Sequence, residues 1–120
     1  MFRKFLFIVL FFPLSLSAQI NTDRMLETGK NALYFEDYAL SIQYFNQIIY
    51  AKPYLYDPYF YRGLAKFYLE DFQGADTDIT SAIKINPFIV GAYQLRGLVR
   101  IRLSDFDGAI ADYRKAITFE

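Results

Sequence analysis

Two stretches of the chain match each other position by position: YFYRGLAKFYLEDFQGADTD at residues 59–78 and YQLRGLVRIRLSDFDGAIAD at residues 93–112. Both keep a tyrosine, an arginine, a glycine, a leucine, an aspartate, a glycine–alanine pair and a final aspartate at the same places. One constant interval therefore separates every matched pair. A period of this length, about 34 residues, indicates a repeat protein, in which small units stack and share one hydrophobic core.

The same period extends toward the N-terminus and defines a third unit. Glycines recur at this interval at Gly29, Gly63 and Gly97. Aspartates followed by an aromatic residue keep this phase at Asp37, Asp71 and Asp105, and isoleucines keep it at Ile49, Ile83 and Ile117. Pro53 and Pro87 are separated by the same interval. The sequence therefore predicts three units of one kind.

Helix signals divide each unit into two helices. Asn21 or Thr22 is expected to cap the first helix of the chain, and Asp57, followed by Pro58, the third. Carboxylate caps for the second helices are predicted at Asp37, Asp71 and Asp105, where each also faces the positive end of a helix dipole. Prolines are expected to stop the second helices of the first two units. The chain is thus predicted to form six helices after Ile20.

The in-phase glycines fall inside the predicted helices, where glycine costs about 1 kcal/mol relative to alanine. An offsetting benefit is needed, and close approach of the second helix of the unit provides one. The small residues Ser41, Ala75 and Ala109 are expected to face the glycines from that helix. Each unit is therefore predicted to be an antiparallel helix pair, and the pairs to stack into a solenoid.

Over about residues 22–120 this pattern resembles the tetratricopeptide repeat family, through Tyr59 with Gly63, Ala75 with Ala82, and Pro87, and through the matching positions of the third unit. The resemblance implies an all-α, right-handed solenoid with units at residues 22–55, 56–89 and 90–120, the last without a capping helix. The first unit departs most from the family pattern, since Met25, Ser41 and Ile48 replace its usual residues. Such a departure suits a terminal unit.

Residues 1–18 read as a secretory signal peptide. Arg3 and Lys4 precede an apolar run from Phe5 to Leu16, and small residues follow, with cleavage expected after Ala18. The run is too short to span a hydrocarbon core of about 30 Å as a helix, although an uncleaved anchor is the alternative. The protein is therefore expected to be exported, to the periplasm in the first place, with secretion or attachment to the envelope as alternatives.

Composition excludes several classes of function. The chain has 13 basic and 13 acidic residues, and loss of Arg3 and Lys4 with the leader would leave a net charge of −2. Because the signs are interspersed, nucleic acid is not an expected partner, and the membrane is expected to be contacted only through the leader. Cysteine and histidine are absent. We therefore expect no metal, no cofactor and no catalytic residues.

Two arginine–aspartate combinations are predicted to be structural ion pairs: Arg62 with Asp78, and Arg96 with Asp112. The aspartate follows the arginine at the same interval in both, and the first unit has Thr28 and Tyr44 in their places. Both members are therefore present together or absent together. Pairing within a helix pair is the main expectation, and pairing between units, Asp78 with Arg96, is the alternative.

The family resemblance implies a concave groove, lined by the first helix of each unit, that holds a peptide or a partner helix. By register, the expected groove residues are largely apolar and aromatic: Leu26, Lys30, Leu33, Tyr34, Phe60, Leu64, Phe67, Tyr68, Gln94, Leu98, Ile101 and Arg102. Aromatic-rich exposed surfaces usually bind partners. The alternative is that further repeats or another segment cover this surface.

The sequence thus predicts an exported module that binds a protein or peptide and is not an enzyme. Two alternatives stay open: a structural or assembly segment of a larger envelope protein, and an accessory domain to an enzyme beyond residue 120. Ile110, Tyr113 and Ile117 are expected on an uncovered terminal face of the third unit. Because solenoids need a polar cap for solubility, further repeats or another chain are expected to stack there.

Overall fold

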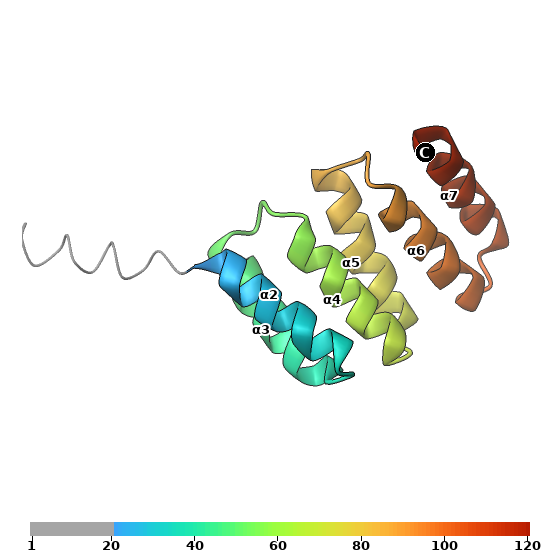
Figure 1. The fold of residues 1–120 in the computed structure, drawn as a ribbon. Helices are drawn as coiled ribbons and strands as arrows, with labels where there is room; N and C mark the ends of the chain where they lie inside the picture. The colour runs from blue at the N-terminus through green and yellow to red at the C-terminus, as the bar shows by residue number, and fades with distance from the viewer. Residues whose placement is uncertain (1–20) are drawn as a thin grey trace, which may run out of the picture.

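The computed structural model describes residues 21–120, and the predicted signal peptide lies outside them. These residues form six α-helices and no strands (Figure 1): α2 (Thr22–Tyr34), α3 (Tyr38–Ala51), α4 (Asp57–Tyr68), α5 (Phe72–Ile85), α6 (Val90–Arg102) and α7 (Phe106–Phe119). None of the helices in this part of the chain combines the length and the apolar character needed to cross a bilayer.

The helices pack as three successive pairs, α2 with α3, α4 with α5 and α6 with α7. The second helix of each pair also packs against the first helix of the next, so that α3 contacts α4 and α5 contacts α6. In Figure 1 the pairs follow one another from α2 and α3 at one end to α7 at the other. The predicted all-α solenoid of three antiparallel helix pairs is confirmed.

The turn inside each pair has one backbone conformation in all three units. Its middle residue is left-handed although it is not glycine, with φ of 65°, 62° and 62° at Glu36, Glu70 and Ser104. In the first unit the amide of Asp37 donates to the carbonyl of Ala32 at 2.8 Å, and that of Glu36 donates to Leu33 at 3.0 Å. This is the Schellman arrangement that ends a helix and reverses the chain.

The residue after each turn is the predicted aspartate cap. The side chain of Asp37 accepts a hydrogen bond from the amide of Leu40 at 3.3 Å, and Asp71 accepts one from Gly74 at 3.0 Å. A side chain at Gly74 would collide with the carboxylate of Asp71. Glycine at this position therefore lets the cap close tightly, and the first unit, which has leucine there, makes the longer bond.

The start of α4 differs from the prediction that Asp57 caps it. The helix includes Asp57, its N-cap is Tyr56, and no side chain bonds to the first amides. Pro58 is compatible with this earlier start because its fixed φ and missing N–H fit the first turn of a helix. Asp57 still lies in the first turn, where its charge raises the pKa of the neighbouring Tyr56 hydroxyl. At the start of α2, by contrast, Asn21 is the cap and accepts from the amide of Arg24 at 3.1 Å.

The in-phase glycines lie where the two helices of a unit touch, but the side chains nearest to them are large rather than small. A methyl group on Gly29 would lie 2.6 Å from Cε1 of Phe45, and one on Gly63 would lie 2.6 Å from Cδ1 of Ile79. The side chains nearest to these two glycines are therefore Phe45 and Ile79, rather than the expected Ser41 and Ala75. The facing residue comes four positions later, and glycine makes room for its bulk.

The main core lies between the second and third units. Ala75 and Ile79 of α5 are buried there against Ala92, Leu95 and Val99 of α6. Small residues on the second helix thus allow close packing against the next unit, rather than against the glycine of their own unit. The same stacking positions the first helices side by side, α2 next to α4 and α4 next to α6, and creates a continuous inner surface.

Candidate functional site

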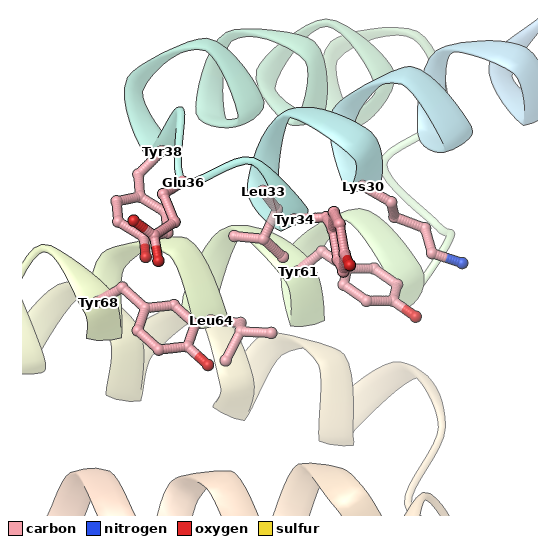
Figure 2. A pocket seen from close by; sticks show the side chains of 8 residues that line it. All are labelled: Lys30, Leu33, Tyr34, Glu36, Tyr38, Tyr61, Leu64 and Tyr68. Atoms are coloured by element: carbon pink, nitrogen blue, oxygen red, sulfur yellow. The ribbon is translucent and has the colours of Figure 1, made fainter.

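A depression of about 370 Å³ opens on the first helices of the first two units. It is lined by four tyrosines, two leucines and two charged residues: Lys30, Leu33, Tyr34, Glu36, Tyr38, Tyr61, Leu64 and Tyr68. We call it the tyrosine pocket (Figure 2). Five of the twelve predicted groove residues line it, namely Lys30, Leu33, Tyr34, Leu64 and Tyr68.

The pocket has an aromatic group at each end. Tyr38 and Tyr68 stack with ring centroids 5.2 Å apart, and Glu36 lies beside them (Figure 2). At the other end the ammonium of Lys30 lies 5.1 Å from the ring centroid of Tyr61. The side chain of Tyr34 is 81% exposed. The rings of Tyr34 and Tyr68, the latter 53% exposed, are therefore open to a ligand.

Neighbouring groups raise the pKa of two residues of the pocket, Lys30 and Tyr38. Tyr61 and Glu27 raise the pKa of Lys30, whose ammonium is 3.5 Å from Oε1 of Glu27. Partial burial, together with Glu36 and Tyr68, raises the pKa of Tyr38. A raised pKa keeps a lysine cationic and a tyrosine neutral. At neutral pH the pocket therefore offers one ammonium and a hydroxyl that donates hydrogen bonds.

The middle of the predicted groove is less available than expected. Phe60 and Phe67 pack against the core between the second and third units. The guanidinium of Arg102 lies 5.6 Å from the ring centroid of Phe67 and equally far from that of Phe72. Leu26 is half-buried, whereas Ile101 is exposed. Phe60 and Phe67 are therefore primarily packing residues.

Two of the predicted groove residues on α6 belong to a separate hollow. Gln94 and Leu98 line a second depression of about 380 Å³ together with residues of α7: Tyr113, Ala116, Ile117 and Glu120. The inner surface thus carries two hollows, one at each end of the solenoid, with a packed aromatic segment between them.

The structure brings both arginine–aspartate combinations together within their own units. The Arg62 guanidinium donates to both carboxylate oxygens of Asp78 at 2.7 and 2.8 Å, and Arg96 donates to both oxygens of Asp112 at 2.7 and 2.9 Å. Both aspartates are 2% exposed. Pairing of Asp78 with Arg96 between units does not occur. Such two-bonded pairs fix the geometry of the helices that carry them.

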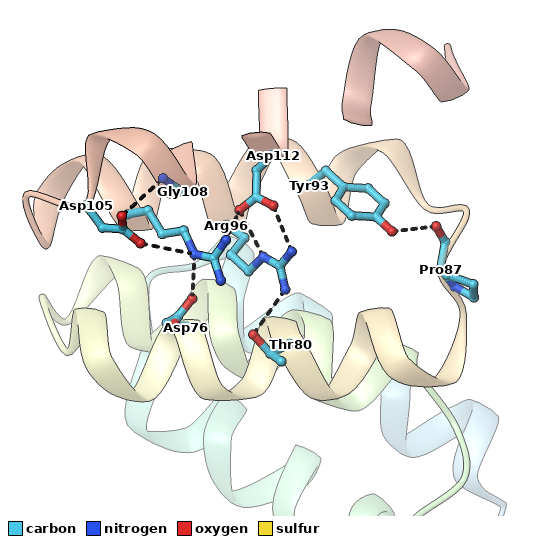
Figure 3. Close-up of polar contacts among 9 residues, drawn as sticks. Asp76, Thr80, Pro87, Tyr93, Arg96, Asp105, Gly108 and Asp112 are labelled. Atoms are coloured by element: carbon cyan, nitrogen blue, oxygen red, sulfur yellow. Dashed lines mark hydrogen bonds and ion pairs between the residues drawn. The ribbon is translucent and has the colours of Figure 1, made fainter. Parts of the chain in front are cut away.

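Each arginine also contacts the preceding unit, which the sequence analysis did not foresee. Arg62 donates to Oδ1 of Asn46 at 2.8 Å, and Arg96 donates to Oγ1 of Thr80 at 3.3 Å (Figure 3). Asn46 and Thr80 occupy equivalent register positions in the first two units. A polar residue at this position in both units was the sequence signal that could have predicted these contacts. The arginines therefore join neighbouring units as well as the two helices of one unit.

A second cation completes each aspartate site. Lys66 lies 3.0 Å from Asp78, and Arg100 lies 3.0 Å from Asp112. Burial alone lowers the pKa of Arg96, but the hydrogen bonds and charge of Asp112 outweigh it, so that the pKa is raised. Each aspartate thus contacts two cations, and neither lines one of the two hollows. Their geometry is that of structural pairs.

The chemistry of the described residues is that of a binding surface. Residues 21–120 contain no cluster of three or more carboxylate, histidine or cysteine side chains arranged to hold a metal. Tyr38, Tyr61 and Glu36 were missed as pocket residues. Glu36 and Tyr38 lie outside the first helices, which were expected to line the groove, and Tyr61 lies on α4 but outside the register positions expected to do so. The signal for Tyr38 was its place directly after the cap of α3, which brings it to the end of the inner surface.

Comparison with known proteins finds one family profile and several solved structures that are similar to the chain. Residues 90–120 match the sequence profile of the tetratricopeptide repeat. No curated protein matches the chain. The tetratricopeptide repeat (TPR) domain of Arabidopsis OM64 is similar with 29% identity and a TM-score of 0.80, over 82% of each chain.

Two further solved structures show the same fold. The first TPR domain of Spaghetti (RPAP3), bound to the HSP90 peptide SRMEEVD, is 26% identical with a TM-score of 0.80, over 82% of this chain and 79% of its own. MamA is 25% identical with a TM-score of 0.81, over 90% of this chain and 64% of its own. The chain is therefore similar to the tetratricopeptide repeat in the sequence of residues 90–120, and to solved TPR domains in its fold.

Proposed function

We propose that this protein is a binding module that holds a segment of a protein or peptide in the tyrosine pocket, and that it acts after export, in the periplasm. The fold supports a binding role, since a similar TPR domain was solved with the peptide SRMEEVD. The leader-like sequence of residues 1–18 supports export. A binding module, rather than an enzyme, also agrees with the chemistry of the described residues.

The single observation that carries the binding role is the exposed aromatic lining of the pocket. Tyr34 and Tyr68 are 81% and 53% exposed, yet both line one hollow together with the half-buried Leu33 and Leu64. Aromatic and aliphatic side chains that are exposed together in a concave site usually mark a binding site. Tyrosine gives large contact area with few rotatable bonds, which lowers the entropy cost of binding.

The pocket chemistry specifies the partner in part. A bulky apolar side chain of the peptide would fill the space over Leu33 and Leu64, and the tyrosine hydroxyls would donate to its backbone carbonyls. Lys30 would favour a carboxylate at one end. A clamp for a C-terminal carboxylate, known in this family, uses lysine with asparagine. We do not carry it over, because Leu26 and Lys30 occupy the corresponding positions here.

Two other roles differ from this one in a measurable way. A structural segment of a larger envelope protein would need the solenoid but not the pocket, and an accessory domain would change the activity of a linked enzyme. In both cases substitution of exposed pocket tyrosines would leave the function intact. The pocket is therefore the feature that separates the three proposals.

The test is selection of binding peptides from a random peptide library, followed by affinity measurement on variants. Tyr34→Ala and Tyr68→Ala should each weaken the selected peptides about tenfold or more, because both remove exposed contact area. Tyr50→Ala is the matched control, since Tyr50 is 94% exposed and does not line the pocket. Equal affinities for all three variants would rule the pocket out as the site.

Export is tested separately. A fusion of the full chain to alkaline phosphatase, which is active only after export, should give activity, and deletion of residues 1–18 should abolish it. Activity that survives the deletion would contradict a leader in these residues.

A further inference from the structure

The tyrosine pocket offers many hydrogen-bond donors and few acceptors. Its four tyrosine hydroxyls and the ammonium of Lys30 can all donate, whereas Glu36 is the one lining residue whose side chain only accepts. Among residues 21–120 two tyrosine hydroxyls donate to protein atoms, those of Tyr59 and Tyr93, and neither lines the pocket. The hydroxyls of the pocket are therefore available to donate to a ligand.

Tyr59 and Tyr93 show which acceptor such a hydroxyl takes elsewhere in this fold. Tyr59 donates to the carbonyl of Pro53 at 3.0 Å, and Tyr93 donates to the carbonyl of Pro87 at 2.7 Å (Figure 3). A proline has a carbonyl but no N–H. One tyrosine hydroxyl is therefore enough to satisfy the backbone polar group that a proline brings to a contact.

A peptide without proline would match this lining less well. Each of its residues brings an N–H as well as a carbonyl, and burying an N–H without an acceptor is costly. A polyproline II segment brings carbonyls alone at its prolines, and no internal hydrogen bond competes for them. Its backbone is also fixed in advance, which lowers the entropy cost of binding. The donor-rich pocket therefore favours proline.

The apolar side chains of the pocket suit the same kind of segment. Leu33 and Leu64 lie between its two aromatic ends, and both are half-buried (Figure 2). Tyr34 and Tyr68 leave 81% and 53% of their surface exposed beside them. Grooves lined by aromatic rings are the surfaces on which proline-rich segments dock in other binding modules.

The two charged residues of the pocket lie at its opposite ends, Glu36 beside Tyr38 and Lys30 near Tyr61 (Figure 2). Among residues 21–120 Glu36 forms no ion pair, and the pair of Lys30 with Glu27 is exposed and 3.5 Å long. Six positions along a helix rise about 9 Å, and so does one turn of polyproline II, which has three residues. Charges three positions apart in such a segment would therefore meet both residues.

We propose that the tyrosine pocket binds a polyproline II segment of a partner protein, with a basic and an acidic residue three positions apart and two prolines between them. The prolines lie against the tyrosine rings, and their carbonyls accept from the hydroxyls. The basic residue faces Glu36, and the acidic residue faces Lys30. This inference rests on the proposed binding role of the pocket and specifies the class of its partner.

The experiment compares eight-residue peptides by fluorescence anisotropy with the full chain. The test peptide has two prolines at each end and a Lys-Pro-Pro-Glu centre, or the reverse order of charges if that binds more tightly. In the second peptide alanine replaces every proline. The chain should bind the test peptide at least about tenfold more tightly than the alanine peptide, because alanine adds N–H groups and flexibility.

Variants of the chain then locate the contacts. Tyr34→Phe with Tyr68→Phe removes two hydroxyls and keeps the rings, and should weaken the test peptide about tenfold. Tyr50→Phe is the matched control, since Tyr50 is 94% exposed outside the pocket. Glu36→Lys should weaken the test peptide about threefold, and glutamate in place of its lysine should restore the affinity.

Two results would overturn the proposal. The first is equal affinity for the test and alanine peptides, or no binding of either. If peptides selected from the random library still lose affinity in Tyr34→Ala, the pocket remains the binding site and only the partner class is wrong. The second is an unchanged affinity of the test peptide in the double phenylalanine variant, which would place the segment elsewhere. If Tyr34→Ala also leaves the selected peptides unaffected, the proposed function fails as well.

Discussion

The two ends of the solenoid share one backbone design but expose different chemistry. At one end α2 presents Arg24, Glu27 and Asn31 to solvent, at positions where α4 and α6 are buried. At the other end α7 presents Ile110 and Ile117, at 50% and 70% exposure. The first end is therefore polar, and the second is apolar, like the surfaces that are buried between units.

This difference shows how a repeat array separates stacking from recognition. Every unit can stack, because the pattern of small and large residues is repeated. A few substitutions out of phase then set the chemistry of each face. Glu27 in place of Tyr61 or Leu95 puts a polar residue at one end, and Arg114 in place of Asn46 or Thr80 puts a positive charge at the other.

The largest effect is expected from removing the same register side chain at an internal junction and at the end. Ile79→Ala should destabilise the fold by about 2–4 kcal/mol, because it leaves a cavity under α6. Tyr113→Ala should cost only about 1 kcal/mol, since Tyr113 is covered on one side alone. Chemical denaturation measures both values. Equal losses would mean that Tyr113 is as well packed as Ile79.

The second largest loss of stability is expected from breaking an ion pair. Asp78→Asn keeps the shape of the side chain but leaves Arg62 and Lys66 without their buried counter-charge, and should cost about 2–3 kcal/mol. Glu27→Gln is the control, because its pair with Lys30 is exposed and 3.5 Å long, and it should change stability by less than about 0.5 kcal/mol. If Asp78→Asn is as mild as its control, the pairs do not hold the second unit together.

The smallest effect should come from the turns, and it should be the same at both ends. Glu36→Gly and Ser104→Gly each relieve a left-handed non-glycine residue, and should stabilise the fold by about 0.5–1 kcal/mol. Ser104→Ala should bring no gain. Thermal unfolding measures both gains in stability. Unequal gains for Glu36→Gly and Ser104→Gly would mean that the two ends differ in backbone strain as well as in side-chain chemistry.

Much of the fold was predictable because its signals are local and repeated. Three aspartate caps, three in-phase glycines and two prolines defined six helices and their pairing. Arg62 and Asp78 were recognised as partners since they are present or absent together. The nearest neighbour of Gly63 was not foreseen, because it depends on the rotation of α5 about its axis, and this rotation places Ile79 there.

The candidate site was predictable only in part, and for a similar reason. Lys30, Leu33 and Tyr34 follow from the register of the first helices. Glu36 and Tyr38 enter the pocket because the left-handed turn at Glu36 directs the start of α3 toward α4, and no glycine marks that turn in the sequence. Phe60 and Phe67 looked exposed from the periodicity, but packing between units covers them.

Mapping a peptide selected from the library by NMR chemical shifts compares the two ends most directly. The signals of Tyr34, Tyr38 and Tyr68 should move on titration, while those of Ile110, Tyr113 and Ile117 stay in place. Shifts confined to α7, or of equal size at both ends, would contradict the tyrosine pocket as the binding site.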